Sequence, residues 1–190
     1  MAKRLFIAVD IDRATREQVG HISIRVRDAI GTTRATWVRA DRMHLTLHFA
    51  GEADAAHEQR VRNAMAPPID VAPFEVSFDG LGVFPGRGSP RVLWLGVAAG
   101  LEPLRRLHAV LAGRERTLAM PERSGGAFTP HLTLARFRDR LREPTAAEIA
   151  RIPASAGPSR IDRVTLYESR LSPAGPTYVA LAETLLPRSG

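Results

Sequence analysis

Hydrophobic and polar positions along the 190-residue chain change their period several times, and each change predicts a new element. A mostly apolar run over residues 5–11, which Asp10 interrupts, indicates a short, mostly buried strand. Apolar residues then recur at helical spacing, at Val19, Ile22, Val26 and Ile30. Gly31 ends this predicted helix. Residues 36–39 have an extended pattern, and residues 43–49 alternate until Gly51 ends the strand.

The rest of the chain repeats these two periods. Helical patterns cover residues 53–65, 101–118 and 145–152. Strand patterns cover residues 74–78, 91–97, 131–137, 161–167 and 177–181. Segments that contain Gly and Pro, at residues 80–90 and 121–130, predict loops. Since no linker or low-complexity segment divides the chain, residues 1–190 are expected to form a single α+β domain with mostly antiparallel strands.

The composition excludes several classes of protein. The chain contains no cysteine, which rules out a disulfide scaffold, a zinc ribbon and a thiol nucleophile. At 44% hydrophobic residues, it has enough apolar material for one sizeable core. No apolar run approaches the roughly 20 residues needed to span a bilayer. The first apolar stretch stops at Asp10. This stretch is too short to be the apolar segment of a signal peptide. These features predict a cytoplasmic protein that does not enter a membrane.

The chain is basic, with 27 Lys and Arg residues against 20 Asp and Glu and a formal net charge of +7. Lys3 is the one lysine, and every other basic residue is arginine. Two interpretations of this bias are open. On the first, the arginine bias reflects the composition of the coding sequence. On the second, the planar guanidinium groups of arginine supply hydrogen-bond donors that bind phosphate. On the second interpretation the partner is acidic, as nucleic acid is.

One short sequence, His-Leu-Thr-Leu, occurs twice in the chain. It spans residues 44–47 and again residues 131–134, each time on a predicted strand. In each half of the chain, a strand and a helix precede the repeated strand. A single His-x-Thr pair would mean little, but two identical copies in matched contexts predict two similar lobes related by an approximate two-fold axis.

The spacing within the repeat has a chemical consequence. Residues i and i+2 of a strand point to the same face, so His44 and Thr46 share one face, as do His131 and Thr133. The intervening leucines point into a core. If the two strands face each other across a cleft, two imidazoles can act as base and acid on opposite sides of a phosphorus atom. The threonine hydroxyls can donate to the non-bridging oxygens as charge builds on them.

Two other interpretations of these histidines are disfavoured. A lone histidine on an apolar strand is usually structural, but this explanation fits two histidines at matched positions less well. His44 and His48 have the i, i+4 spacing of a helical zinc pair, yet the strand pattern and Gly51 argue against a helix here. No cluster of Asp or Glu accompanies the histidines to bind a metal ion, and no cofactor is predicted.

At these residues the chain resembles the two-histidine (2H) phosphoesterase superfamily, whose signature is a pair of His-x-Thr/Ser-x motifs. The resemblance extends to the bacterial and archaeal RNA 2′,3′-cyclic phosphodiesterases, also called 2′-5′ RNA ligases. The stretches that carry it are residues 4–8, 37–38, 44–52, 80–85, 90–96, 128–136, 166–171 and 175–178. Together they extend over nearly the whole chain.

The resemblance implies a bilobal α+β fold, in which two pseudo-symmetric lobes with antiparallel sheets line a central cleft. It also implies metal-independent hydrolysis of RNA 2′,3′-cyclic phosphate ends to 2′-phosphomonoesters, with 2′-5′ RNA ligation as a side activity. By resemblance, His44 is the proton donor to the 3′-oxygen, and His131 is the proton acceptor that activates water. Thr46, Thr133 and Arg136 match the groups that bind the phosphate.

Three polar residues near the motifs have two interpretations each. Arg136 stands five residues after His131, where strict alternation puts it on the opposite face. For Arg136 to contact the phosphate as in the family, the strand must bulge or twist after Leu134, or the side chain must reach round the end of the strand. Otherwise Arg136 is a solvated charge at the strand end. His48 shares the predicted face of the first motif, as a pH-dependent phosphate contact or as a peripheral residue. Arg91 either meets the RNA backbone or is solvated.

Aromatic residues are candidates for stacking on a nucleobase. Phe84 and Phe128 flank loops near the motifs, and either could line the cleft, although core packing explains each of them as well. Trp37 and Trp94 lie inside strand patterns and are expected in the core.

The expected partner, by resemblance, is RNA with a 2′,3′-cyclic phosphate end, such as tRNA halves or other oligonucleotides, and the chain is expected to be a monomer. Two alternatives stay open. The first is a 2H phosphodiesterase for another small cyclic phosphate, such as ADP-ribose 1″,2″-cyclic phosphate, or for a 2′-5′ oligonucleotide. The second is a non-catalytic module that binds RNA ends, for which salt-dependent binding without turnover is expected.

Overall fold

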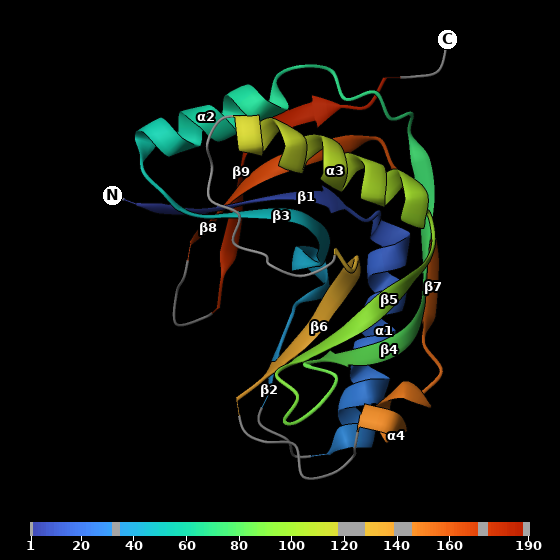
Figure 1. Ribbon diagram of the computed structural model, residues 1–190. Coiled ribbons are helices and arrows are strands. Elements are labelled where there is room, and N and C mark those ends of the chain that lie inside the picture. The colour runs from blue at the N-terminus through green and yellow to red at the C-terminus, as the bar shows by residue number, and fades with distance from the viewer. Residues whose placement is uncertain (1, 32–34, 118–127, 139–145, 171–174, 188–190) are drawn as a thin grey trace.

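The computed structural model describes residues 2–31, 35–117, 128–138, 146–170 and 175–187. Within these residues the chain forms nine strands, four α-helices and one 3-10 helix, η1 (Figure 1). The strands are β1 (Lys3–Asp10), β2 (Ala35–Trp37), β3 (His44–Ala53), β4 (Phe74–Phe84), β5 (Val92–Ala99), β6 (His131–Phe137), β7 (Ser155–Ile161), β8 (Arg163–Arg170) and β9 (Thr177–Leu185). The helices are α1 (Arg13–Ile30), η1 (Ala40–Arg42), α2 (Ala55–Met65), α3 (Leu101–Thr117) and α4 (Ala146–Ala150).

All nine strands belong to one antiparallel sheet in the order β7-β4-β5-β6-β3-β1-β8-β9, with β2 paired to β6. This order divides into two similar halves that meet between β6 and β3, which share one registered pair, Leu45 with Leu132. We call the half with β1, β3, β8 and β9 the first lobe, and the half with β4, β5, β6 and β7 the second lobe. The predicted bilobal α+β architecture is confirmed, with the correction that the two sheets are continuous.

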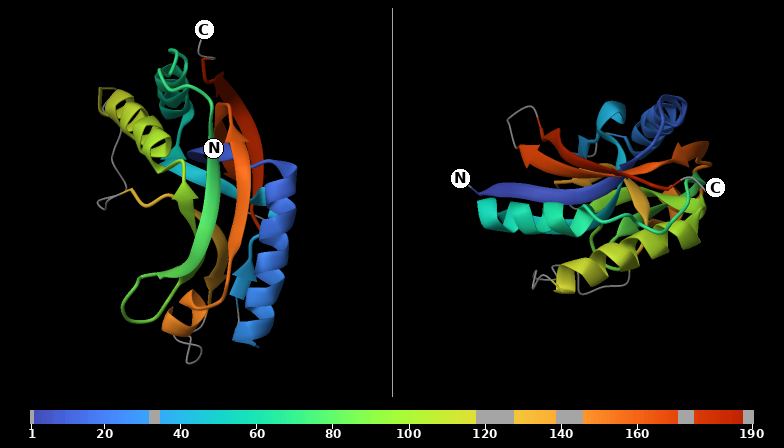
Figure 2. Two further views of the ribbon diagram at one scale, coloured as in Figure 1. Left: turned by 90° about the vertical axis from the view of Figure 1, so that its right-hand side faces the viewer. Right: turned by 90° about the horizontal axis from the view of Figure 1, so that it is seen from above.

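Each long helix covers the sheet of the opposite lobe. α1 follows β1 but packs on β7, where the backbone amide of Asp12 donates to Oγ of Ser159 at 2.8 Å. α3 follows β5 but packs on β3, where Nδ1 of His108 donates to the carbonyl oxygen of Leu47 at 2.8 Å. α2 covers the first lobe and α4 the second, so each lobe is covered by one long and one short helix (Figures 1 and 2).

The first helix shows how the sequence directs this packing. Oδ1 of Asp12 accepts a hydrogen bond from the amide of Thr15 at 2.8 Å and caps the start of α1. Its buried side includes the predicted stripe of Val19, Ile22, Val26 and Ile30. Each such side chain contributes about 1.5–3 kcal/mol when it leaves water, so the stripe holds α1 against the sheet.

Several strands differ from the prediction. β3 continues through Gly51, which was expected to end it, as far as Ala53, and β9 continues past residue 181 to Leu185, because both remain paired with their neighbours in the sheet. β4 continues to Phe84, through part of the predicted loop, because Leu81 and Val83 are buried in alternation although glycines surround them. β7 has no counterpart among the predicted strands. It lies at the outer edge of the sheet, where a proline is tolerated because Pro158 has no amide proton to donate to a neighbouring strand. Ser159 of the same strand faces the interior. None of the helices in the described part of the chain is both long and apolar enough to cross a bilayer.

Candidate active site

The two His-Leu-Thr-Leu segments lie side by side at the centre of the sheet. β3 begins at His44 and β6 begins at His131, and Leu45 pairs with Leu132. An antiparallel register centred on this pair sets the two histidines diagonally across from each other, each beside the threonine of the other segment. Diagonal neighbours lie roughly 7–8 Å apart, a distance that accommodates one phosphate group.

The same positions are buried in both segments. The histidines and threonines are half-buried and the leucines are buried, and the match continues for three more residues, to Ala50 in one strand and to Phe137 in the other. The structure therefore brings His44, Thr46 and their counterparts in β6 to one face of the sheet.

Both imidazoles are held in the same way. Nδ1 of His44 lies 2.9 Å from the carbonyl oxygen of Arg42, and Nδ1 of His131 lies 2.8 Å from that of Thr129. Because a carbonyl oxygen can only accept, Nδ1 carries a proton in each case. The nitrogen that gains and loses a proton is therefore Nε2 of each ring.

A bulge in β6 decides the position of Arg136. Thr133 pairs with Trp94 and Ala135 pairs with Leu93, which leaves Leu134 as an extra residue in the ladder. Beyond it the two faces exchange, so the exposed Arg136 shares the face of the second motif. Of the predicted alternatives, the bulge is the one present.

A matching bulge in β3 corrects the prediction for His48. Thr46 pairs with Ala8 and His48 pairs with Ile7, which leaves Leu47 as the extra residue. His48 therefore points to the core and is 9% exposed. Phe49 takes the place that strict alternation gives to His48, and its side chain is 49% exposed. The prediction that His48 shares the face of the first motif is thus wrong.

Aromatic rings and a carboxylate surround His44. Its ring stacks on Phe6 with 4.7 Å between centroids, and Tyr178 lies perpendicular to it with 5.1 Å between centroids. Asp10 pairs with His44 across β1 and β3, and Tyr167 donates its hydroxyl proton to Oδ2 of Asp10 at 2.6 Å. Burial raises the pKa of Tyr167, as does its bond to Asp10, so this hydroxyl remains a donor.

The ring contacts of His131 in the described residues are with apolar aromatic faces and edges. Phe84 lies nearly perpendicular to the imidazole with 5.1 Å between centroids, and Trp94 lies at 6.2 Å between centroids. Trp94 in turn lies over Gly82, where an added Cβ would be 2.1 Å from the indole ring. The glycine therefore makes room for the indole beside the histidine. Trp94 pairs with Thr133 on the cleft face, so the expectation that it lies in the core is wrong.

The surroundings change the proton affinity of the two histidines differently. Burial lowers the pKa of both His44 and His131 from the ordinary value of 6.5, and the Arg136 guanidinium lowers both further. The carbonyl oxygen at each Nδ1 acts in the opposite direction. For His44, the Asp10 carboxylate also raises the pKa, while Arg16 lowers it. His131 has no such carboxylate among the described residues.

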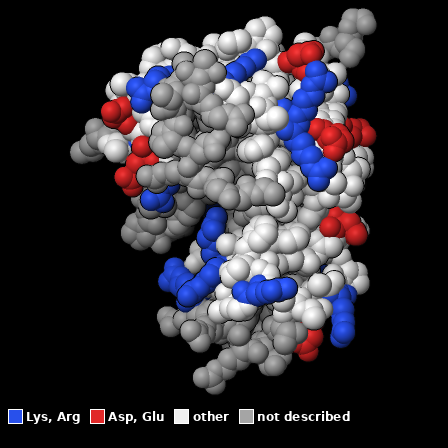
Figure 3. Space-filling model, in the orientation of Figure 1, with Lys and Arg blue, Asp and Glu red and all other residues white. Residues whose placement is uncertain are grey.

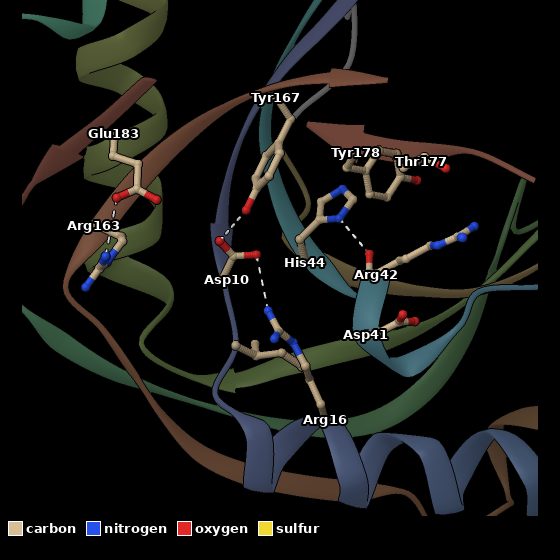
Figure 4. A pocket seen from close by; sticks show the side chains of 11 residues that line it. Asp10, Arg16, Asp41, Arg42, His44, Arg163, Tyr167, Thr177, Tyr178 and Glu183 are labelled. Carbon is tan, nitrogen blue, oxygen red and sulfur yellow. Dashed lines mark hydrogen bonds and ion pairs between the residues drawn. The ribbon is translucent and has the colours of Figure 1, made fainter. Parts of the chain in front are cut away.

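A cavity of about 610 Å³ opens beside His44 (Figure 4). Its lining comprises Asp10, Ile11, Arg16, Asp41, Arg42, His44, Arg163, Tyr167, Thr177, Tyr178 and Glu183. On the face of the molecule in Figure 3, Lys and Arg side chains lie on both the upper and the lower part, and most of those on the upper part have Asp or Glu side chains beside them. The cavity and the basic side chains are both compatible with a large anionic ligand.

The remaining predicted residues lie in three different places. Phe84 contacts the second motif histidine, as described above. Phe128 stacks on His108 of α3 with 4.2 Å between centroids and packs against the core. Arg91 is exposed just before β5, and its guanidinium donates to the carbonyl oxygen of Arg138 at 3.4 Å. Within the described residues, no three His, Cys, Asp or Glu side chains gather closely enough to hold a metal ion.

A family model described as the 2′-5′ RNA ligase superfamily matches residues 11–172, a range that includes both motifs and Arg136. The chain belongs to this superfamily. The resemblance read from the paired motifs is confirmed, and the central position of those motifs in the sheet gives it a structural basis.

Relatives and solved structures of this superfamily match most of the chain. An RNA 2′,3′-cyclic phosphodiesterase of Archaeoglobus fulgidus is 33% identical over 177 residues, covering 92% of this chain and 96% of the relative. One from Methanothermobacter thermautotrophicus is 32% identical over 186 residues, covering 94% and 96%. Among solved structures, TT0787 of Thermus thermophilus has a TM-score of 0.79 at 27% identity, covering 98% of this chain and 100% of the other. E. coli LigT complexed with 3′-AMP also has a TM-score of 0.79 at 27% identity, covering 99% and 100%.

Several residues beside the motifs were not predicted from the sequence. The position of Trp94 could have been predicted from the alternation in its strand. Leu93 and Leu95 on either side of it are both buried, so alternation places the indole on the cleft face. Asp10 and Tyr167 carried none, since they reach His44 from other strands and no local spacing connects them to it.

Proposed function

We propose that the protein hydrolyses the 2′,3′-cyclic phosphate end of RNA to a 2′-phosphomonoester, by paired histidine acid–base catalysis without a metal ion. The observation that carries this proposal is the matched anchoring of His44 and His131, which leaves Nε2 of each ring to exchange protons on one face of the sheet. The names of the archaeal relatives support the class of substrate.

In the proposed reaction, phosphorus lies between the two imidazoles. Nε2 of His131 takes a proton from water, and the water oxygen forms a bond to phosphorus. On the opposite side, the bond from phosphorus to the 3′-oxygen breaks, and Nε2 of His44 donates its proton to that oxygen. The products are a 2′-phosphomonoester and a 3′-hydroxyl. Proton exchange with solvent then returns both histidines to their starting states.

The assignment of donor and acceptor rests on the difference between their neighbours. The Asp10 carboxylate stabilises an imidazolium at His44, which favours the protonated form that an acid needs. His131 lies against Phe84 and Trp94, and apolar surroundings favour the neutral form that a base needs. Before each turnover, one ring must hold a proton and the other must not.

Thr46, Thr133 and Arg136 are proposed to bind the phosphate. Their side chains share the face of the two imidazoles, and each hydroxyl can donate to a non-bridging oxygen. The guanidinium of Arg136 can donate two parallel hydrogen bonds as negative charge develops. Donors fixed in this way stabilise the transition state more than the ground state.

The direct test is to incubate the protein with an oligonucleotide that ends in a 2′,3′-cyclic phosphate, in the presence of EDTA, and to identify the product by phosphorus NMR. A 2′-phosphomonoester is expected. The double variant His44→Ala/His131→Ala is expected to give no product above background, while His21→Ala, which removes an exposed histidine of α1, is expected to behave as the wild type.

Other products would overturn particular parts of the proposal. A 3′-phosphomonoester would reverse the leaving group. Turnover of only ADP-ribose 1″,2″-cyclic phosphate or a 2′-5′ oligonucleotide would change the substrate. Salt-dependent RNA binding without turnover would instead indicate a module that binds RNA ends. If EDTA abolished turnover, the reaction would not be metal-independent.

The same site is proposed to support 2′-5′ ligation as a side reaction. When a 5′-hydroxyl replaces water, its oxygen forms the bond to phosphorus, the bond to the 3′-oxygen breaks, and a 2′-5′ phosphodiester results. Because both motifs belong to the same chain, we also propose that the protein acts as a monomer on RNA ends such as those of tRNA halves. Sedimentation equilibrium at the concentration used for the assay tests this state.

A further inference from the structure

The cavity beside His44 is larger than the reacting phosphate requires. Its volume of about 610 Å³ is typical of pockets that enclose a whole small molecule. Its lining includes His44 but neither His131 nor Arg136. The cavity therefore extends away from the phosphate site on the side of the proposed proton donor.

The geometry of displacement indicates which part of the substrate lies there, and this step rests on the proposed function. Entering water and the leaving 3′-oxygen occupy opposite sides of phosphorus, so the ribose that carries the 3′-oxygen lies on the His44 side. The RNA chain continues from that ribose through its 5′-oxygen. The next group in this direction is the phosphate that joins the terminal nucleotide to the preceding one.

The lining of the cavity contains groups that suit this phosphate. Arg16, Arg42 and Arg163 come from α1, η1 and β8, and in Figure 4 His44 lies between Arg163 on one side and Arg42 on the other. Arginine presents a planar fork of donors that matches the oxygens of phosphate. Three such groups from separate elements make a site that is built by the tertiary fold.

The carboxylates in the lining already have partners. Asp10 accepts from Tyr167 at 2.6 Å and from Arg16 at 3.4 Å, and Glu183 accepts from Arg163 at 3.3 Å. These contacts leave less of the charge of Arg16 and Arg163 for a ligand. They also hold both side chains in place.

The carboxylate of Asp41 is occupied in the same way. It accepts two hydrogen bonds from Arg39, each at 3.0 Å. In contrast, Arg42 donates to the backbone carbonyl of Pro176, which is neutral, and within the described residues no carboxylate forms an ion pair with it. Of the three arginines in the lining, Arg42 is therefore the one that no described carboxylate holds in an ion pair, and its charge acts on Asp41 only at longer range.

We propose that this cavity binds the 5′-phosphate of the terminal nucleotide, with Arg42 as its principal contact. The site thus distinguishes an RNA end from an isolated nucleoside cyclic phosphate, because an RNA end carries this phosphate and the nucleoside does not. The carboxylates that line the same cavity moderate its attraction for anions in general.

The test compares two substrates that differ only in this group: adenosine 2′,3′-cyclic phosphate and 5′-phosphoadenosine 2′,3′-cyclic phosphate. In the wild type, the 5′-phosphate is expected to raise kcat/KM about 10-fold, the lower end for a charge-assisted contact at a half-exposed site. In Arg42→Gln the ratio of the two values is expected to fall close to one. In Arg42→Lys, which keeps the charge but loses the fork, part of the preference is expected to remain.

The matched control is Arg105→Gln, which removes the same charge from an exposed position on α3 and is expected to keep the ratio of the wild type. A wild-type ratio near one, with both substrates turned over, would overturn the cavity assignment and leave the proposed function intact. An unchanged ratio in Arg42→Gln, or an equal loss in Arg105→Gln, would also overturn it. Failure to turn over either substrate or a longer RNA end would instead contradict the proposed function.

Discussion

The first and second lobes share the same backbone arrangement at the motif but place different side chains on it. β3 and β6 share a burial pattern, a bulge at the second leucine and a carbonyl contact at Nδ1 of the histidine. At the fifth position after the histidine, however, the first lobe has Phe49 and the second has Arg136. The repeated frame fixes where the side chains lie, and the residues placed on it decide what each lobe does.

The neighbours of the two histidines differ in the same sense. His44 has a carboxylate nearby, Asp10, which is held by a tyrosine hydroxyl, whereas His131 contacts Phe84 and Trp94. A symmetric scaffold with two identical imidazoles would have no preference for the direction of proton transfer. The preference therefore comes from residues outside the repeated motif.

Removal of either histidine has the largest expected effect. His44→Ala and His131→Ala are each expected to lower kcat/KM about 10³-fold, as the loss of an acid or a base generally does. The two variants should differ in their pH profiles: His131→Ala loses the acidic limb, because the base no longer titrates, and His44→Ala loses the alkaline limb. Steady-state kinetics between about pH 5 and 9 measure this difference. Identical profiles in the two variants would contradict the division of roles.

The equivalent positions Arg136 and Phe49 provide the second test. Arg136→Gln is expected to lower kcat/KM about 100-fold, because the transition state loses a charged donor. Phe49→Ala is expected to cost about 10-fold or less, since it removes an exposed ring and no charge.

The pH dependence of the arginine variant gives an independent measurement. Because the Arg136 guanidinium lowers the pKa of His131, its removal should raise that pKa and move the acidic limb of kcat/KM to higher pH. Equal losses in the two variants, or an unmoved acidic limb in Arg136→Gln, would argue against an active role that is specific to the arginine.

Gly82 tests the apolar surroundings of the second histidine. In Gly82→Ala the new methyl group would overlap the indole of Trp94, so the ring must shift beside His131. The variant is expected to lose about 1–3 kcal/mol of unfolding free energy, measured by urea denaturation, together with part of its activity. Gly86→Ala is the matched control, since no heavy atom lies within 4 Å of its added Cβ. Equal stability of the two variants would contradict this account of the contact.

Asp10→Asn has the smallest expected effect. The carboxylate raises the pKa of His44, so its removal should lower that pKa and move the alkaline limb of kcat/KM to lower pH. The acidic limb should stay in place, because no effect of Asp10 on His131 is found. Asp28→Asn, at an exposed position of α1, serves as the control. A shift of both limbs, or of neither, would show that Asp10 does not act on the first histidine alone.

The convergence of the two motifs was predictable from the sequence, whereas the path of the chain after each motif was not. Alternation holds from His44 to Leu47 and fails beyond it, because the bulge exchanges the two faces. In the second copy, the consecutive apolar residues Leu134 and Ala135 break the alternation, and this break indicates the bulge in the sequence itself. In the first copy the residue equivalent to Ala135 is His48. Because its side chain is polar, the sequence continues to alternate and gives no sign of the bulge.

Features that depend on contacts between distant segments also could not be predicted. Asp10 and Tyr167 reach His44 through the pairing of β1 with β3 and β8. β7 carries glycine and proline at an edge position, and this composition looks like a loop until its partner β4 is known. The local pattern predicted most elements correctly, but it did not indicate which helix covers which lobe.

The exchange of helices between the lobes has a consequence for the chain as a whole. A fragment that ends between β4 and β5 would carry α1 without β7, the strand that α1 covers, and the complementary fragment would carry α3 without β3. Each half alone would leave apolar faces in water, while the two together can cover both. A sequence that reads as two copies of one pattern therefore encodes parts that depend on each other to fold.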